Sequence, residues 1–417
     1  MEDISNKQLG VIPGDGDRID RGPWNIMVFP GGLPDPVLYP SKVATTYDKH
    51  IVDVSMLTWR DIHSKDEGDQ GPEQMRARKT READWLRSCD LLAREIERCR
   101  QRGIRIVVAY RMNAEDYYHH SWRLSDFGRA HPEWRIPKTD AERAADPAGE
   151  PYTAALDPAV PEVYEHRLRI FREVAENYDI DGIELNWRRW FHMISDPLEN
   201  HPILTNMVRE IRQMLDEVAK RKGRPRLLLG ARVGPMLRGR FLKEDFPGTL
   251  YGEPTDSSCE YLGLDVETWI KEELVDYVCP CLFGPDMLPG LVKTAEFAGL
   301  AKNKNVGVYP TLSPWTAWGR VREPLQDKSL DQLRDMMRRH RDEICNAALQ
   351  YFADGADGIS KFNWSTDDGQ RLDRYEGSLG YMKTLLFVHQ FLGSAETLEE
   401  CLKQRPIVET HARDWEL

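Results

Sequence analysis

The chain has 417 residues and a formal net charge of −12, with 69 Asp and Glu against 57 Lys and Arg. This acidic balance argues against a nucleic-acid partner, since neutralising phosphates requires a basic face. No apolar run is long enough to cross a membrane, and the seven cysteines form neither a disulfide framework nor a paired zinc-binding spacing. We expect a globular protein without nucleic-acid or membrane partners, whose oligomeric state the sequence leaves unknown.

Three stretches of the chain differ in composition and pattern. Residues 1–24 form a polar leader without the basic start and apolar middle of a secretory signal, and residues 393–417 form a charged, helical tail. Residues 25–392 carry nearly all of the strand and helix patterns. We expect this central part to be the catalytic domain of a protein that is either cytoplasmic or exported with its signal already removed.

The central part alternates between short apolar runs and helical patterns. Eight strand-like runs begin near residues 25, 51, 104, 180, 227, 276, 306 and 358. Between most of them, apolar residues recur at three- and four-residue spacing, as in residues 157–178 and in the long segment that Ser329 caps. Eight strands alternating with helices predict an α/β fold, a closed (β/α)8 TIM barrel with long strand-to-helix loops.

An open, doubly wound sheet is the alternative architecture for this alternation. Its nucleotide-binding versions carry a G-x-G-x-x-G or phosphate-loop fingerprint after a strand. No such glycine pattern follows any of the eight runs. The barrel is therefore the preferred prediction, and no cofactor is expected.

The fourth run, within residues 178–187, ends in a group of side chains that can do chemistry. Gly182, Glu184 and Asn186 share one side of the predicted strand because side chains alternate, and Trp187 and Arg188 follow at its exit. In parallel α/β sheets and barrels, ligands bind beyond the carboxyl ends of the strands. This exit is the first place to expect a site.

Three short motifs resemble the glycosyl-hydrolase-like TIM barrels. They are residues 181–187 in the fourth run, residues 110–113 at the end of the third, and Asn363-Trp364 at the eighth. The fourth run is also similar to the chitinase-type strand Asp-Gly-x-Asp-x-Asp-x-Glu. The resemblance covers residues 25–392 and implies a TIM barrel that hydrolyses glycosidic bonds with carboxylate side chains.

The sequence departs from these families at the acidic positions. On the chitinase-type pattern, the two inner acids fall on Glu184 and Asn186, and the proton donor falls on Arg188. The retaining barrels imply a further carboxylate at the end of the seventh run, yet residues 306–322 contain no Asp or Glu. Neither family's catalytic residues therefore carry over whole.

Glycoside hydrolysis uses two carboxyl groups, about 5 Å apart in retaining enzymes and about 6.5–9.5 Å apart in inverting ones. Glu184 is the first candidate; the alternative is a buried acid that pairs with Arg111 or Arg232. Asp286, just after the sixth run, is the second, although Pro-Asp is also common in turns. Asp61 is a weaker candidate. We predict that Glu184 and Asp286 form the catalytic pair.

Arginines gather at the predicted strand exits. Arg111, Arg188 and Arg232 fall there, and a guanidinium group binds carboxylate or sulfate oxygens in a bidentate manner. These side chains favour an anionic sugar, uronic or sulfated. The alternative is that they neutralise Glu184 and its neighbours in an acidic protein.

Amide, imidazole and indole groups complete the predicted sugar site. Indoles stack on the apolar faces of sugar rings, and polar side chains bind the hydroxyls. The candidates are Asn113, His119, His120, Asn186, Trp187, Asn363 and Trp364. His119 and His120 are also metal-type side chains, but the first run lacks the His-x-His motif of metal-dependent barrel hydrolases, so no metal is predicted.

The sequence thus predicts a glycoside hydrolase that cleaves a poly- or oligosaccharide by a two-carboxylate mechanism. Two other function classes stay open. A non-catalytic carbohydrate-binding barrel would account for Asn186 and Arg188 at positions where acids are expected. A metal-dependent hydrolase would use His119 and His120 as ligands.

Overall fold

Parallel strands and the helices that connect them make up two compact units in the computed structural model. Unit 1 comprises residues 1–29, 232–258 and 276–417, and unit 2 comprises residues 30–231 and 259–275. The structure describes residues 4–6, 26–32, 35–49, 80, 83–113, 125–145, 152–188, 192–241, 257–282, 291–312, 329–361, 388 and 390–404.

Unit 2 is organised around two parallel strands, β3 (Arg105–Arg111) and β6 (Gly182–Asn186), with β7 (Leu228–Val233) beginning beside β6. Every residue of β6 is buried. A strand buried on both faces is typical of parallel sheets that helices cover.

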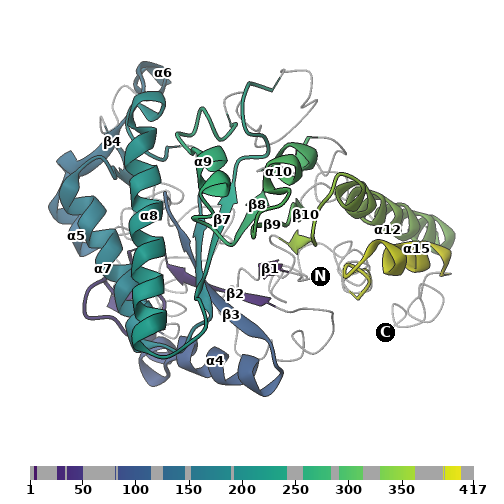
Figure 1. Cartoon of the computed structure of the whole chain (residues 1–417), viewed down its shortest axis with the longest axis horizontal. Coiled ribbons are helices and arrows are strands. Elements are labelled where there is room, and N and C mark those ends of the chain that lie inside the picture. The colour runs from purple at the N-terminus through teal and green to yellow at the C-terminus, as the bar shows by residue number, and fades with distance from the viewer. Residues whose placement is uncertain are drawn as a thin grey trace. The chain divides into compact units, whose positions relative to one another are not determined.

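Four helices of unit 2 each bury one face. They are α4 (Leu91–Gln101), α7 (Pro161–Asn177), α8 (Pro197–Arg221) and α9 (Val266–Lys271), and the unit also contains the short 3-10 helix η1 (Tyr47–Lys49). Helices α7 and α8 pack against each other (Figure 1). In α7, Val163, Phe171, Val174 and Ala175 are buried, and they belong to the three- and four-residue repeat that predicted this helix. Asp265 caps α9 by accepting a hydrogen bond from the Thr268 N–H at 3.1 Å.

The long segment after β3 contains structure that the sequence did not predict. It includes α5 (Asp126–Ala130), η5 (Pro132–Trp134) and α6 (Asp140–Ala145). Strands β4 (Arg135–Pro137) and β5 (Tyr152–Leu156) form a separate antiparallel pair. Elements of three to six residues are too short to show a helical or strand repeat, so only their contacts with the rest of unit 2 reveal them.

Five sheet positions of unit 1 follow one another through parallel pairs. Strand β8 (Tyr277–Pro280) pairs with β9 (Gly307–Val308), and β10 (Thr311–Leu312) pairs with β11 (Ser360–Lys361). Strand β11 pairs with β1 (Ile4–Asn6), which pairs with β2 (Ile26–Gly32). Only Tyr309 and Pro310 separate β9 from β10. The seventh predicted run therefore has a different neighbour on each side.

The helices of unit 1 are α10 (Thr294–Ala301), α12 (Leu330–Ala353) and α15 (Ala395–Lys403). The predicted cap of α12 is confirmed: Ser329 and Gln332 form a reciprocal capping box. Helix α15, in the predicted tail, lies along α12 (Figure 1).

The predicted α/β class is confirmed, and seven of the eight predicted runs contain strands. Closure into an eight-stranded barrel stays a prediction, because the second run, residues 50–57, lies outside the described residues. None of the described helices combines the length and apolarity needed to cross a bilayer.

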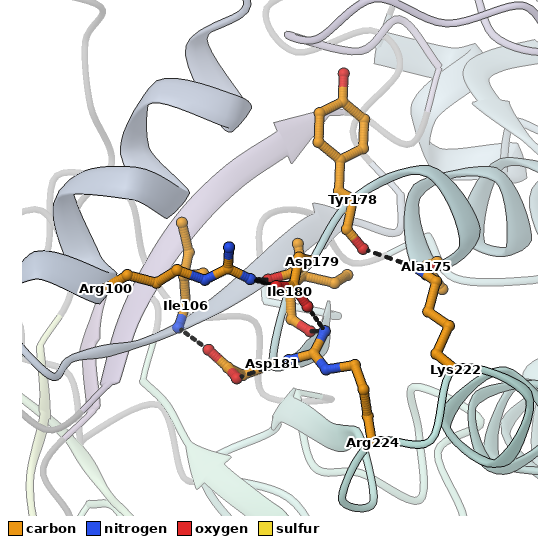
Figure 2. A network of polar contacts seen from close by, with 9 residues as sticks. All are labelled: Arg100, Ile106, Ala175, Tyr178, Asp179, Ile180, Asp181, Lys222 and Arg224. Carbon is orange, nitrogen blue, oxygen red and sulfur yellow. Dashed lines mark hydrogen bonds and ion pairs between the residues drawn. The ribbon is translucent and has the colours of Figure 1, made fainter.

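A polar network holds the start of β6 (Figure 2). The Asp181 carboxylate accepts hydrogen bonds from the backbone N–H of Ile106, at 2.8 Å, and from Arg224, at 3.2 Å. The backbone of Asp181 also bonds on both sides, since its N–H donates to the Ile106 carbonyl and its own carbonyl accepts from the Leu228 N–H, each at 2.8 Å. One residue therefore joins the starts of β3, β6 and β7.

Cations surround the same turn (Figure 2). Arg224 donates to the Ile180 carbonyl at 2.8 Å and forms an ion pair with Asp179, which Arg100 also contacts. Lys222 donates to the carbonyls of Ala175, at 2.9 Å, and Tyr178, at 3.0 Å. These carbonyls end α7, where a positive charge is favourable.

Substitution of Gly182 tests how closely β6 and β7 approach each other. A Cβ at this position would lie 2.3 Å from the Leu228 carbonyl oxygen, a backbone atom that cannot rotate away. We expect Gly182→Ala to lower the free energy of unfolding by about 1–3 kcal/mol, measured by chemical denaturation.

The control is Gly299→Ala in α10, where an added Cβ would meet nothing within 4 Å. Alanine is the better helix former, so this change should be neutral or stabilising by up to about 1 kcal/mol. Equal effects of the two substitutions would contradict the close approach of the strands.

Candidate functional site

The carboxyl ends of β3 and β6 bring together the first group of predicted site residues. Ala109 is the register partner of Glu184, and Arg111 is the partner of Asn186. Because partners in a parallel pair share a face and alternate residues repeat it, Glu184, Asn186 and Arg111 lie on one face of the two strands. Glu184 is completely buried, and Asn186 is 3% exposed.

Asn186 also shapes the chain where it leaves β6. Its carbonyl accepts a hydrogen bond from the Met112 N–H at 3.0 Å, and its side-chain Oδ1 accepts from the Arg188 N–H, also at 3.0 Å. The first bond extends the pairing of β3 and β6 by one residue, and the second closes a tight turn. The buried side chains of Asn113 and Arg188 follow directly after the two strands.

This arrangement offers a carboxylate, two amides and two guanidinium groups at the ends of neighbouring strands. A buried carboxylate is a group that can hold or transfer a proton, or attack a carbon, once a substrate excludes water. Guanidinium and amide groups donate hydrogen bonds to sugar hydroxyl, carboxylate or sulfate oxygens. The chemistry that this end of unit 2 can perform is thus acid–base or nucleophilic catalysis on a polar ligand.

Trp187, a predicted sugar contact, follows directly after β6. Its side chain is fully buried against Trp269 of α9, with ring centroids 6.3 Å apart. Trp269 in turn donates to the Thr205 hydroxyl of α8 at 3.2 Å. Trp187 is one residue out of phase with Glu184 and Asn186, and its contact with a sugar stays a prediction.

Arg232 lies in unit 1, where its side chain reaches two other strands of the sheet. Its guanidinium donates to the Thr311 hydroxyl of β10, at 2.6 Å, and to the Ser360 hydroxyl of β11, at 2.9 Å, and all three residues are buried. Strand β8 lies beside β7, and the segment formed by β9 and β10 lies between β8 and β11. Counted this way, a flat sheet would place β7 and β11 about 14 Å apart, beyond the length of an arginine side chain. The sheet of unit 1 is therefore strongly curved.

Five predicted site residues lie outside the part of the chain that the structure describes. They are Asp286, His119, His120, Asn363 and Trp364. The weaker candidate Asp61 does too. Among the residues that are described, no three His, Cys, Asp or Glu side chains group as metal ligands would.

The sequence analysis missed a buried acid–imidazole pair in unit 2. His166 Nε2 of α7 lies 2.8 Å from Asp35 Oδ2, and the second oxygen of Asp35 accepts from the Thr45 N–H at 2.8 Å. The ring of Phe127 stacks on His166 with centroids 4.0 Å apart. Asp35 precedes a proline in a loop and His166 sits on a helix face, so nothing in the sequence connects them. The pair ties this loop to α7.

A tyrosine cluster packs on the opposite face of β3 from Arg111. The hydroxyls of Tyr39 and Tyr110 are 2.5 Å apart, and the ring of Tyr110 lies 4.9 Å from that of Phe171 in α7. Burial raises the pKa of both Tyr39 and Tyr110 far above the usual range of tyrosine. These phenols therefore stay protonated and act as hydrogen-bonding parts of the core.

The two buried tryptophans provide a matched test of these packing roles. The Trp269 N–H has a hydrogen-bond partner, whereas no described residue accepts a hydrogen bond from the Trp187 N–H. Replacement by phenylalanine removes the indole N–H and a similar side-chain volume at both positions. We expect Trp269→Phe to cost about 1 kcal/mol more unfolding free energy than Trp187→Phe, measured by denaturant titration. The reverse order would mean that Trp187 has a polar role.

Comparison with known proteins finds similarity to solved structures only. No protein-family model and no curated protein matches the sequence. Among solved structures, α-L-fucosidase isoenzyme 2 from Paenibacillus thiaminolyticus is 12% identical with a TM-score of 0.41; the match covers 95% of this chain and 46% of the fucosidase. This chain therefore spans less than half of that enzyme's length.

Two further neighbours have shorter matches. An α-amylase from Lactobacillus plantarum is 12% identical with a TM-score of 0.39, over 87% of this chain and 70% of the amylase. A GH18 chitinase from Cycas revoluta, in complex with (GlcNAc)4, is 9% identical with a TM-score of 0.36, over 75% of this chain and 68% of the chitinase. These neighbours are glycoside hydrolases.

Proposed function

We propose that residues 25–392 close into a (β/α)8 barrel that hydrolyses glycosidic bonds. Two features of unit 1 support closure. The seventh run pairs with β8 on one side and with β11 on the other, and β11 connects through β1 to β2, the first run. The reach of Arg232 from β7 to β10 and β11 requires the curvature that a closed sheet has.

Glu184 is the central carboxylate of the proposed mechanism. The observation that carries this proposal is its complete burial in β6, two residues before the strand ends, on the face that it shares with Asn186 and Arg111. The carboxyl ends of barrel strands form the mouth where catalytic residues lie. An acid buried among polar and cationic neighbours at such a place favours a functional role over packing.

The proposed reaction needs a second carboxyl group. Asp286, which the sequence places just after the sixth run, is the proposed partner. One of the two protonates the leaving oxygen, and the other attacks the anomeric carbon or activates water. The separation of the two groups, about 5 Å or about 6.5–9.5 Å, distinguishes a retaining from an inverting enzyme.

The substrate that we propose is a poly- or oligosaccharide with uronic or sulfated sugars. Arg111 ends β3, which Asn113 follows, and Arg188 follows β6, which carries Glu184. The guanidinium groups of both arginines suit anionic sugar substituents. Arg232, His119, His120, Asn363 and Trp364 are the further sugar contacts proposed from the sequence.

A non-catalytic carbohydrate-binding barrel is the second candidate function. The observation that favours it is the Asn186 turn, in which the amide oxygen accepts the Arg188 N–H at positions where the chitinase-type pattern has two acids. Such a protein would bind the same glycans and release them unchanged.

The catalytic proposal is tested by Glu184→Gln. Glutamine keeps the shape and the hydrogen bonding of the side chain but removes its acid, base and nucleophilic capacity. We expect kcat to fall about a hundredfold or more on the best substrate from a panel of neutral, uronic and sulfated glycans. Turnover is measured by release of reducing ends.

The control for this substitution is Glu95→Gln, because Glu95 is also a largely buried acid of unit 2 but lies on α4, where it pairs with Arg98. This variant should keep wild-type kcat. A folded Glu184→Gln protein with near-normal turnover would overturn the assignment. Wild-type protein that binds a glycan and never cleaves it would establish the binding function.

A two-carboxylate mechanism also predicts that chelation has no effect. We expect kcat and KM to stay unchanged after dialysis against EDTA, whereas an enzyme with a catalytic zinc or magnesium ion would lose activity. Loss of activity that one divalent ion restores would favour the metal-dependent alternative and His119 and His120 as ligands.

A further inference from the structure

Helices α12 and α15 of unit 1 share one apolar interface. Ile344 and Cys345 of α12 and Leu398 and Cys401 of α15 are all completely buried in a single cluster. The two helices lie side by side in Figure 1. Burial of both thiols among apolar side chains places them in the same interface, since each belongs to a helix that contributes only one face to it.

A hydrogen bond fixes how the two helices are aligned. Arg341 of α12 donates from Nη1 to the carbonyl of Gln404, just after α15, at 2.7 Å. Cys345 lies one helical turn after Arg341, and Cys401 lies nearly one turn before Gln404. In antiparallel helices this alignment brings the two cysteines opposite each other.

The two thiols are in direct contact. A hydrogen bond joins their side chains, and neither cysteine forms a disulfide in this structure. The bond donated by Cys345 lowers the pKa of the Cys401 thiol, and the positive charge of Arg341 acts in the same direction. The same bond, together with burial, raises the pKa of Cys345. Cys401 is therefore the sulfur that loses its proton first.

We propose that Cys345 and Cys401 are a redox pair that hydrogen peroxide converts into a disulfide, which locks α15 onto α12. This inference is independent of the glycosidase proposal.

The reaction balances with peroxide as the two-electron oxidant. The Cys401 thiolate attacks one peroxide oxygen, the O–O bond breaks, and the departing hydroxide takes a proton to become water. Cys401 is then a sulfenic acid. The Cys345 sulfur attacks the Cys401 sulfur, the S–O bond breaks, and the second hydroxide leaves as water with the proton of Cys345. Two thiols and one peroxide give one disulfide and two waters.

Burial of the two sulfurs means that the oxidant reaches them only when α15 lifts from α12. Helix α15 has nine residues, and local openings of such short elements require less free energy than global unfolding. The rate of oxidation should therefore rise at denaturant concentrations well below the global transition. A disulfide across the interface then removes this opening.

The test is oxidation of the full, folded chain with hydrogen peroxide, followed by alkylation of free thiols, proteolysis without reductant and mass spectrometry. We expect one linked pair of peptides that contains Cys345 and Cys401, and its loss on treatment with dithiothreitol. The oxidised protein should melt about 5 °C higher than the reduced protein because the cross-link constrains the unfolded chain.

Two variants and one control complete the test. Cys345→Ala and Cys401→Ala should each abolish the linked peptides and the rise in melting temperature. Cys99→Ala, which removes a buried thiol of α4, should keep both. The peptide map of the wild-type protein tests the proposal even if a variant fails to fold. Recovery of Cys345 and Cys401 as separately alkylated or overoxidised thiols from folded, peroxide-treated protein would overturn the proposal, as would an unchanged melting temperature after the linkage forms.

Discussion

The Asp181 carboxylate and backbone hold the start of β6 between β3 and β7, and the candidate site depends on this contact. Its bonds to Ile106 and Leu228 set where β6 begins relative to both neighbours. From that point side chains alternate, so Glu184 and Asn186 reach the same face as Arg111 at the other end of the strand. A shift of one residue would turn Glu184 toward the helices.

The two ends of β6 consequently have different roles. At the amino end, Arg224, Arg100 and Lys222 satisfy carboxylates and helix-terminal carbonyls, and these interactions contribute to stability. At the carboxyl end lie the buried acid and the polar side chains of the proposed site. In parallel barrels, the residues that stabilise the fold and those that catalyse lie at opposite ends of the strands.

Buried charged groups have different kinds of hydrogen-bond partners in the two units. In unit 1 the Arg232 guanidinium bonds two strand hydroxyls, and in unit 2 Asp35 bonds His166 and a backbone N–H. Each arrangement supplies hydrogen bonds to a group that would be costly to bury alone. Each also connects segments that lie far apart in the sequence. These polar contacts therefore add specificity to cores that apolar packing alone would leave less defined.

The sequence by itself determined the α/β alternation, the Ser329 cap and the parity of Glu184 with Asn186, because periodicity and capping are local properties. Tertiary structure decided what long-range contacts control. Trp187 follows Asn186 in sequence, yet its parity and the position of Trp269 direct it into helix packing. The Asp35–His166 pair and the meeting of Cys345 with Cys401 join distant segments, and no local pattern specifies which distant segments become neighbours.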